Sequence, residues 1–424
     1  MSALPMCAQR LDGTQMKPYR LHTWGRYGFF MCFSLIASTA FSQNIPADAP
    51  PNFPLQRTEH RIYDVSIQVT IPWNQPTPPV GGAESPMLWP MLPRTPWSYF
   101  DTSSVKARLV NGQHVQDDLH AWHLAIESDS PEQWHLAFPV PSKLAGRLIF
   151  QVQHQAHTFS SSLHEQSALQ IGWPNEWTED VAAFLQPTEY IKSDHSRFQQ
   201  AVVDVLGENH KKYNPHLAAK MLIRHCLVNI TSNGQYTAFD GQPVRGFNIR
   251  GALAAASRGR GSATDLVCAC VAILRAAGIP ARPVIGMTIA DTVGTKEVPA
   301  QYIVWAEYAL PNVGWVPFNP DRMRGTVNNL SLNVPWQGLG TMPWLNRRIP
   351  IAYTFVAGGK AKAYDAVGPW GWVPMYRKRP LPVSATKTKI PFYHSAEDDA
   401  YILIPNALSI QNLHLTFISS PNSG

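Results

Sequence analysis

The sequence predicts an α+β fold, in which an N-terminal antiparallel β-sandwich is followed by a core with a central buried helix packed on an antiparallel sheet. Three observations support this prediction. Apolar and polar residues alternate with period two over residues 63–71, which is the pattern of a half-buried strand. Helical spacing replaces this alternation after residue 194. Residues 266–277 are almost all apolar, which indicates a helix that is buried on every side.

The composition excludes several classes of protein. The 424 residues are 45% hydrophobic and only 15% charged, with 37 Pro and 14 Trp, which argues against disorder, coiled coils and helical bundles. The formal net charge is +6, but 31 basic and 28 acidic residues follow Ser42. No basic run is long enough to follow a phosphate backbone, so we expect no nucleic-acid partner.

Residues 1–42 are predicted to be a secretory signal peptide. Basic residues precede an apolar run over residues 27–41, and small residues follow it. The run is shorter than the roughly 20 residues of a membrane-spanning helix, although an uncleaved anchor is the alternative. Translation could start at Met1 or at Met16. A cleaved leader would place the protein outside the cytoplasm, secreted or in a bacterial periplasm, with no stable transmembrane span.

A Pro-rich linker, residues 43–54, leads into the predicted sandwich domain, residues 55–172. Segments with strand patterns, separated by clusters of turn residues, occupy residues 63–71, 105–110, 121–126, 134–140 and 148–152. A second domain is predicted over residues 173–330. Residues 331–424 form a C-terminal extension rich in Pro, Gly and Trp, whose role the sequence does not indicate.

The second domain begins with helices. Residues 198–206 have helical spacing after a candidate cap at Asp194 or Ser196, and Asn214-Pro215 opens a helix over residues 215–226. A third, short helix is predicted over residues 252–256.

The buried helix and a set of strands complete the second domain. Thr264 and Asp265 are expected to cap the helix and Gly278 to end it, with Pro280 just beyond. Strands are predicted at residues 282–286, 302–310 and 315–318.

Three motifs in the second domain resemble the bacterial transglutaminase-like family. They are LRAAGIPARPV at residues 274–284, WAE at residues 305–307 and GWVPFNP at residues 314–320. The resemblance covers roughly residues 185–325. It implies a papain/transglutaminase-like core, whose family members catalyse acyl transfer or amide hydrolysis with a Cys-His-Asp triad.

The resemblance also identifies the triad positions in this sequence, and none carries the family's residue. Ala263 takes the position of the nucleophile, Ile303 that of the base, and Asn319 stands where the family has Asp. The chemistry needs a thiolate at a helix N-terminus, an imidazole that moves its proton, and a carboxylate that orients the imidazole. We therefore expect no catalytic residues, and a cleft formed by Ser262, Asp265, Trp305 and Trp315.

A non-nucleophilic, apolar cleft favours a binding or scaffolding module for protein or cell-envelope polymer. The alternative is an active amide acyl-transferase or cysteine-protease-like hydrolase with a rearranged site. A third possibility is a cleft that is filled by packing and binds nothing. Ser262 neighbours the vacated position, but it would need a base. Cysteines inside apolar helices are usually inert core residues, and this is the expectation for Cys226, Cys268 and Cys270.

No metal or cofactor is expected. His120 and His123, like His154 and His157, lie three residues apart in predicted strands, so each pair faces opposite sides and is expected at the surface. The short basic runs at residues 347–348 and 377–379 are also expected to be solvated surface. The oligomeric state cannot be deduced from these patterns.

Overall fold

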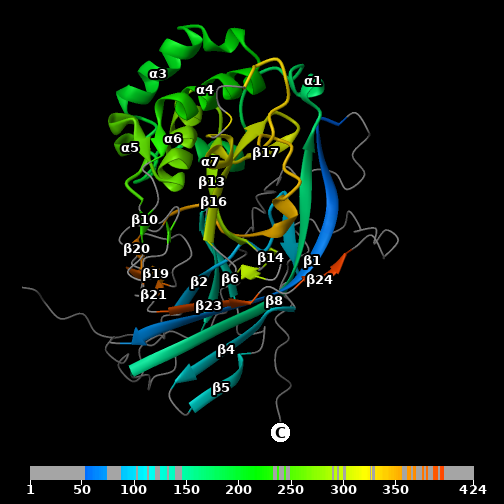
Figure 1. Cartoon of the computed structure of the whole chain (residues 1–424), viewed down its shortest axis with the longest axis vertical. Helices are drawn as coiled ribbons and strands as arrows, with labels where there is room; N and C mark the ends of the chain where they lie inside the picture. Colours follow the sequence, from blue (N-terminus) through cyan, green and yellow to red (C-terminus); the bar gives the residue numbers. More distant parts are fainter. Residues whose placement is uncertain are drawn as a thin grey trace, which may run out of the picture. The chain divides into compact units, whose positions relative to one another are not determined.

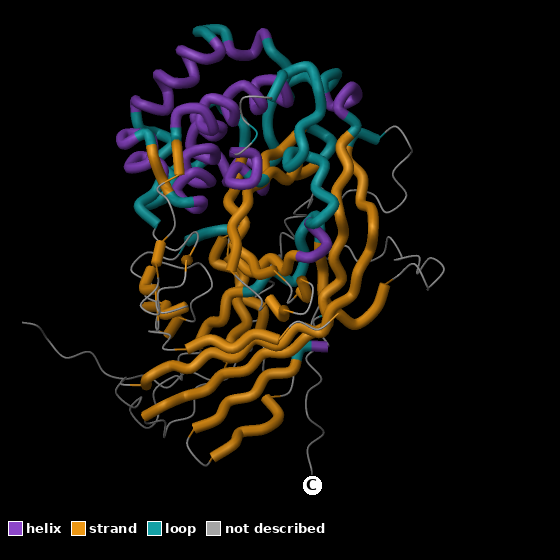
Figure 2. Tube along the Cα trace, viewed as in Figure 1, coloured by secondary structure: helices purple, strands orange, loops and turns teal. Residues whose placement is uncertain are grey.

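The structure is a computed structural model that combines helices with mostly antiparallel sheets (Figures 1 and 2). Residues 1–52 lie outside the described residues. The predicted signal peptide therefore lies outside the described part of the chain. The structure describes residues 53–73, 87–101, 104–111, 114–119, 125–130, 133–138, 146–232, 236–237, 243–244, 249–288, 291–293, 296–298, 302–324, 326, 330–355, 361–363, 366–368, 375–376, 379–380, 385–389 and 392–395.

Two long strands, β1 (Leu55–Trp73) and β8 (Gly146–Leu163), pair antiparallel over nearly their whole lengths (Figure 2). The predicted alternation in β1 is confirmed, because Tyr63, Val65 and Ile67 are buried while Asp64 is exposed. Among the described residues, seven strands share this sheet in the order β23-β1-β8-β4-β5, with β24 on β1 and β3 on β8. The added strands are β3 (Ser98–Phe100), β4 (Lys106–Asn111), β5 (His114–Leu119), β23 (Ala385–Lys389) and β24 (Phe392–Ser395).

A second antiparallel sheet has the order β22-β21-β2-β7-β6. Its strands are β2 (Met87–Pro90), β6 (Ala125–Ser130), β7 (Gln133–Phe138), β21 (Met375–Tyr376) and β22 (Arg379–Pro380). Both sheets thus include strands from the predicted C-terminal extension, a long-range pairing that its composition did not indicate. That the two sheets pack face to face as a sandwich stays a prediction.

Short two-stranded pairs complete the list of sheets in the described part of the chain. Three are antiparallel hairpins, and β9 with β12 is parallel. Their strands are β9 (Thr231–Ser232), β10 (Tyr236–Thr237), β11 (Pro243–Val244), β12 (Arg260–Gly261), β14 (Asp291–Val293), β15 (Lys296–Val298), β19 (Ala361–Ala363) and β20 (Ala366–Gly368).

The longer helices pack against one another, with α6 in contact with α3, α4 and α5 (Figure 1). Asn214 caps α4 as predicted, since its Oδ1 accepts a hydrogen bond from the N–H of Leu217 at 2.8 Å. The cap of α3 is His195, in place of the predicted Asp194 or Ser196. The helices are α1 (Glu165–Ala168), α2 (Glu179–Ala182), η3 (Ala183–Leu185), α3 (Ser196–Leu206), η4 (His210–Lys212), α4 (Pro215–Asn229), α5 (Ala252–Arg258), α6 (Ala263–Ala276), α7 (Pro320–Arg324) and η6 (Leu345–Arg347).

Helix α6 is buried along almost its entire length. Its cap is Ser262, one residue before the α-helical body and two before the predicted Thr264. The helix ends at Gly278 as predicted. Gly278 has a φ of 78°, and the N–H groups of Gly278 and Ile279 donate to the carbonyls of Arg275 and Leu274. This Schellman motif needs a left-handed residue, which explains the glycine.

Helix α6 packs against a four-stranded antiparallel sheet with the strand order β17-β16-β13-β18, and it contacts β13 and β16. Its strands are β13 (Ala281–Thr288), β16 (Tyr302–Leu310), β17 (Gly314–Phe318) and β18 (Arg348–Ala352). The expected domain boundary at residue 330 falls between two strands of this sheet. Strand β18 was not predicted, because its pairing with β13 joins segments about 60 residues apart.

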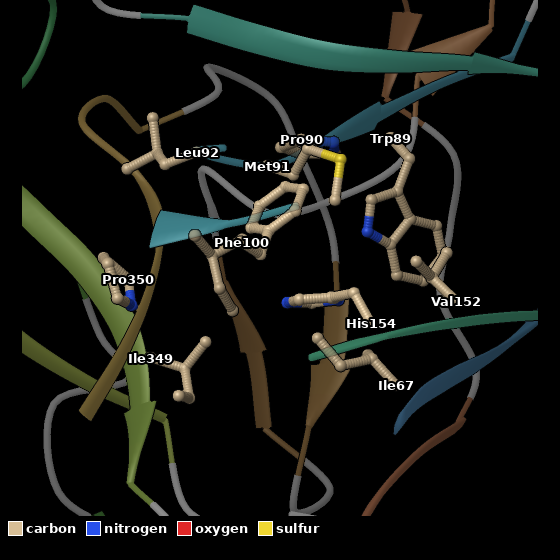
Figure 3. A pocket seen from close by; sticks show the side chains of 11 residues that line it. Ile67, Trp89, Pro90, Met91, Leu92, Phe100, Val152, His154, Ile349 and Pro350 are labelled. Carbon is tan, nitrogen blue, oxygen red and sulfur yellow. The ribbon is translucent and has the colours of Figure 1, made fainter. Parts of the chain in front are cut away.

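One prediction about histidines is wrong. His154 was expected at the surface, but it is 8% exposed and its ring points into a small apolar cavity of about 20 Å³ (Figure 3). It lies two residues from Val152 and Ala156 in β8, so it shares their buried face. His157 faces the other side as predicted, where Tyr99 stacks on its ring. His120 and His123 lie outside the described residues.

Burial makes His154 sensitive to acid. It lowers the pKa of His154 to about 4, from an unfolded value near 6.5. The neutral form is favoured in the folded protein, so the stability is fully present above pH 6.5 and is lost as the pH falls through about 4. Between pH 7 and pH 4, the free energy of unfolding should fall by roughly 2–4 kcal/mol less in His154→Leu than in the unsubstituted chain. Urea unfolding at the two pH values measures this difference. An unchanged pH slope in the variant would contradict the assignment.

Candidate functional site

The three positions that the sequence motifs assign to the triad lie on, or next to, elements that contact one another. Ala263 is the first residue of α6, Ile303 lies in β16, and Asn319 connects β17 to α7. Helix α6 packs on β16, and α7 contacts both. None of the three side chains carries a nucleophile or a proton-transferring group, so the residues at these positions supply no acyl-transfer chemistry.

Asn319 has a structural role. Its side chain is 7% exposed, and its Oδ1 accepts a hydrogen bond from the N–H of Arg322 at 3.2 Å. Its own N–H donates to the carbonyl of Gly338 at 2.8 Å. Asn319 therefore begins α7 as an N-terminal cap, a task that an amide oxygen performs as well as a carboxylate.

Ser262 and Asp265 form a reciprocal capping box at the start of α6. The Oγ of Ser262 accepts a hydrogen bond from the N–H of Asp265 at 3.1 Å. The carboxylate of Asp265 accepts from the N–H groups of Ser262, Arg250 and Gly251, at 3.2, 2.7 and 2.9 Å. Gly261 permits this packing, because a Cβ there would lie 2.7 Å from that of Asp265. Two residues expected to form the cleft thus hold the helix N-terminus together.

The three cysteines of the described residues are unsuited to nucleophilic attack. All are free and buried. Burial raises the pKa of Cys268 and of Cys270 well above the usual range, and a hydrogen bond between Cys270 and Cys226 raises the pKa of Cys270 further. Thiols held in the protonated form react slowly. These residues are packing elements, as expected.

The tryptophans predicted to line the cleft are nearly inaccessible. Trp305 is 2% exposed and Trp315 is 5% exposed. The ring of Trp305 covers Gly286, where a Cβ would lie 2.7 Å from the indole. The two tryptophans therefore offer little surface to a ligand, and an open cleft lined by them stays a prediction.

Two of the sequence motifs meet in a buried ion pair. Arg282 lies opposite Glu307 on neighbouring strands, with its Nη2 2.7 Å and its Nε 2.9 Å from Oε2 of Glu307. The guanidinium lies between the rings of Trp315 and Tyr353, at 3.8 and 3.7 Å from their centroids. Burial raises the pKa of Glu307 even though Arg282 opposes the shift. These two motif residues therefore have a structural role, because each is the buried counter-ion of the other.

A buried polar network connects Glu165, His216, Lys220 and Tyr308, and no sequence pattern predicted it. Lys220 donates to Glu165, His216 Nε2 lies 3.2 Å from the same carboxylate oxygen without the geometry of a hydrogen bond, and His216 Nδ1 lies 2.6 Å from the Tyr308 hydroxyl. Lys220 also donates to the carbonyls of Leu332 and Val334. The partners come from α1, α4, β16 and a distant loop, so no local pattern could have found them. His216 and Tyr308 are fully buried, which makes this a structural network.

Other features of the described residues add little to the site. A hollow of about 390 Å³ lies elsewhere, lined in part by Phe53, Ile171, Trp173 and Pro311. No group of His, Cys, Asp and Glu among the described residues is arranged to hold a metal ion. The described helices are all too short or too polar to cross a membrane.

Comparisons with known proteins identify the family of the core. The model of the transglutaminase-like superfamily matches residues 211–320. No curated protein matches the chain. A candidate cysteine protease from Cytophaga hutchinsonii is 14% identical, with 80% of this chain and 93% of that chain covered and a TM-score of 0.46.

Two other solved structures are more distant. The periplasmic domain of TgpA from Pseudomonas aeruginosa is 14% identical, with 62% of this chain and 98% of that chain covered and a TM-score of 0.26. Red sea bream transglutaminase is 11% identical, with 73% and 58% covered and a TM-score of 0.27. By its match to the family model, the segment at residues 211–320 is a transglutaminase-like domain.

Proposed function

We propose that this chain is a secreted, catalytically inactive transglutaminase-like protein that binds protein or cell-envelope polymer. The N-terminus of α6 supports the proposal most, because Ala263 stands at the position predicted for the nucleophile and Ser262 and Asp265 beside it cap the helix. The preserved motif residues keep the scaffold folded, as the Arg282–Glu307 pair illustrates. A folded domain without a nucleophile is suited to binding.

The alternative, a hydrolase or acyl-transferase with a displaced nucleophile, gains no specific support from the site. The described cysteines are buried, and among the described residues no hydrogen bond joins a cysteine to a histidine. The purified full chain should therefore neither cleave peptide anilides nor incorporate a fluorescent amine into casein. Turnover that disappears in Ser262→Ala, Cys226→Ala, Cys268→Ala or Cys270→Ala would overturn the claim of inactivity.

Binding is tested separately, with purified peptidoglycan and with unfolded casein as probes. The full chain should sediment with one of these polymers, and the same polymer should raise its melting temperature. An absence of both effects would remove the binding function and leave a purely structural role.

Restoring the thiol tests whether the vacated position keeps the family's environment. Ala263 is half-buried at the first position of a 14-residue helix, and Nη1 of Arg324 lies 3.4 Å from the carbonyl of Gly261 beside it. The Cys of Ala263→Cys should therefore have a pKa about one unit or more below the ordinary 8.5. Its reaction rate with a chromogenic disulfide, followed against pH, measures this value. The unsubstituted chain is the control, and an ordinary pKa in the variant would contradict the prediction.

A further inference from the structure

Arg348 is a buried cation that no described acidic residue neutralises. Its side chain is 9% exposed, and its Nη1 is buried without a hydrogen-bond partner in the described part of the chain. The ion pairs found among the described residues include neither Arg348 nor Arg322. Residues 347–348 were expected to be solvated, which is wrong for Arg348. Buried charges are costly unless they are paired, so this arginine needs an explanation.

Arg348 belongs to a group of donors, here called the arginine–tryptophan cluster: Arg322, Arg348, Trp305 and Trp344. The Arg348 guanidinium lies 5.4 Å from the centroid of the Trp305 ring, and that of Arg322 lies 3.7 Å from the centroid of the Trp344 ring. Both indole Nε1 atoms are buried without a hydrogen-bond partner among the described residues. Burial, and then the positive charge of Arg322, lowers the pKa of Arg348 to about 9.

The cluster lies next to the vacated triad positions. Residues opposite each other in antiparallel strands, and residues two apart in one strand, point to the same face. Arg348 is opposite Thr288, Gly286 is opposite Ile303, and Trp305 is two residues from Ile303, so Arg348, Trp305 and Ile303 share one face of the sheet. Arg322 is three residues from Asn319, which accepts its N–H.

We propose that the arginine–tryptophan cluster binds a carboxylate group of the ligand, beside the position that carries the base in active relatives. A guanidinium whose face lies over an indole presents its edge, and the parallel N–H groups of that edge match the two oxygens of a flat carboxylate. A carboxylate would neutralise Arg348 and relieve its repulsion by Arg322. The inference rests on the proposed binding function, since it assigns the chemistry of the ligand.

The test uses the full chain and the peptide acetyl-Ala-Ala-Ala, with a free C-terminal carboxylate or as its C-terminal amide. At ten times the dissociation constant, the acid should raise the melting temperature by about 2 °C or more and the amide should not. Arg348→Met should abolish the shift. Arg347→Met, the same substitution at the exposed neighbour, should keep it and controls for the change in net charge.

The melting temperature of Arg348→Met distinguishes an arginine that binds a ligand from one that only stabilises the fold. Because it removes an unpaired buried charge, the variant should melt at a higher temperature than the unsubstituted chain when no ligand is present. A structural arginine predicts a lower melting temperature and an unchanged response to the acid. Arg322→Met alters an exposed residue and should fold in any case. It should weaken binding of the acid about tenfold, which is measured by calorimetry.

Three results would overturn the proposal. The melting temperature could respond equally to the acid and the amide, or respond to inorganic phosphate but not to the acid. The response to the acid could also persist in both Arg348→Met and Arg322→Met. These results are independent of the turnover and sedimentation assays. Catalysis or a failure to bind polymer would therefore overturn the proposed function without deciding whether the cluster binds a carboxylate.

Discussion

Replacing Arg282 with methionine is expected to lower the free energy of unfolding by about 3–5 kcal/mol. Arg282 is 6% exposed and Glu307 is 1% exposed, so the substitution leaves a carboxylate buried without its counter-ion. The substitution also removes the favourable cation–π interactions of the guanidinium with the rings of Trp315 and Tyr353. Urea unfolding at pH 7 measures the loss. Arg197→Met, an exposed arginine in α3, is the matched control and should change stability by less than about 0.5 kcal/mol.

The double variant Arg282→Met with Glu307→Leu distinguishes the charge effect from packing. Removing both charges eliminates the uncompensated carboxylate, so the double variant should be more stable than Arg282→Met alone. If the double variant is instead less stable than the single one, the residues contribute mainly by shape, and the ion-pair account is wrong. At acidic pH the deficit of the single variant should shrink, because protonation of Glu307 removes the buried charge.

Local features of this fold were predictable, because each depends on residues a few positions apart. Asn214 caps α4 and Gly278 ends α6, as their sequence contexts indicated. The alternation in β1 is likewise read from neighbours. The cap of α3 was misplaced by one residue because His195, an uncommon cap, accepts the hydrogen bond.

Features that depend on distant partners could not be predicted. His154 was assigned to the surface from the spacing of the histidines, and Arg348 because short basic runs are usually solvated. The rings that pack against them, Phe100 at His154 and Trp305 at Arg348, come from other segments of the chain. The membership of residues 348–352 in the core sheet is hidden for the same reason. At the candidate site, the motifs identified the positions that matter, but only the structure showed that Ser262 and Asp265 are occupied as caps.

Lys220→Met should cost about 3–5 kcal/mol at pH 7, because it leaves Glu165 without its principal counter-ion. Lys220 is fully buried, lies 4.9 Å from the centroid of the Trp336 ring and ties α4 to the loop at residues 332–334. Its loss therefore affects packing between elements as well as charge. Lys192→Met, an exposed lysine outside the helices, is the matched control.

The pH dependence identifies the charge effect in this network. Burial alone would raise the pKa of Glu165, but His216 and Lys220 outweigh burial and hold its pKa below the ordinary value. Its ion pair therefore stabilises the folded protein above the unfolded pKa, near 4.5, and this stability is lost as the pH falls through the lower folded pKa. In Lys220→Met the folded pKa should rise, so the deficit relative to the unsubstituted chain should be largest at pH 7 and smaller near pH 4. In the Glu165→Gln background, which has no buried carboxylate, Lys220→Met should lower the stability relative to Glu165→Gln alone by an amount that does not change between these pH values. A constant deficit in Lys220→Met itself would show that Lys220 contributes through packing and its bonds to the loop carbonyls, and that its charge has little effect on stability.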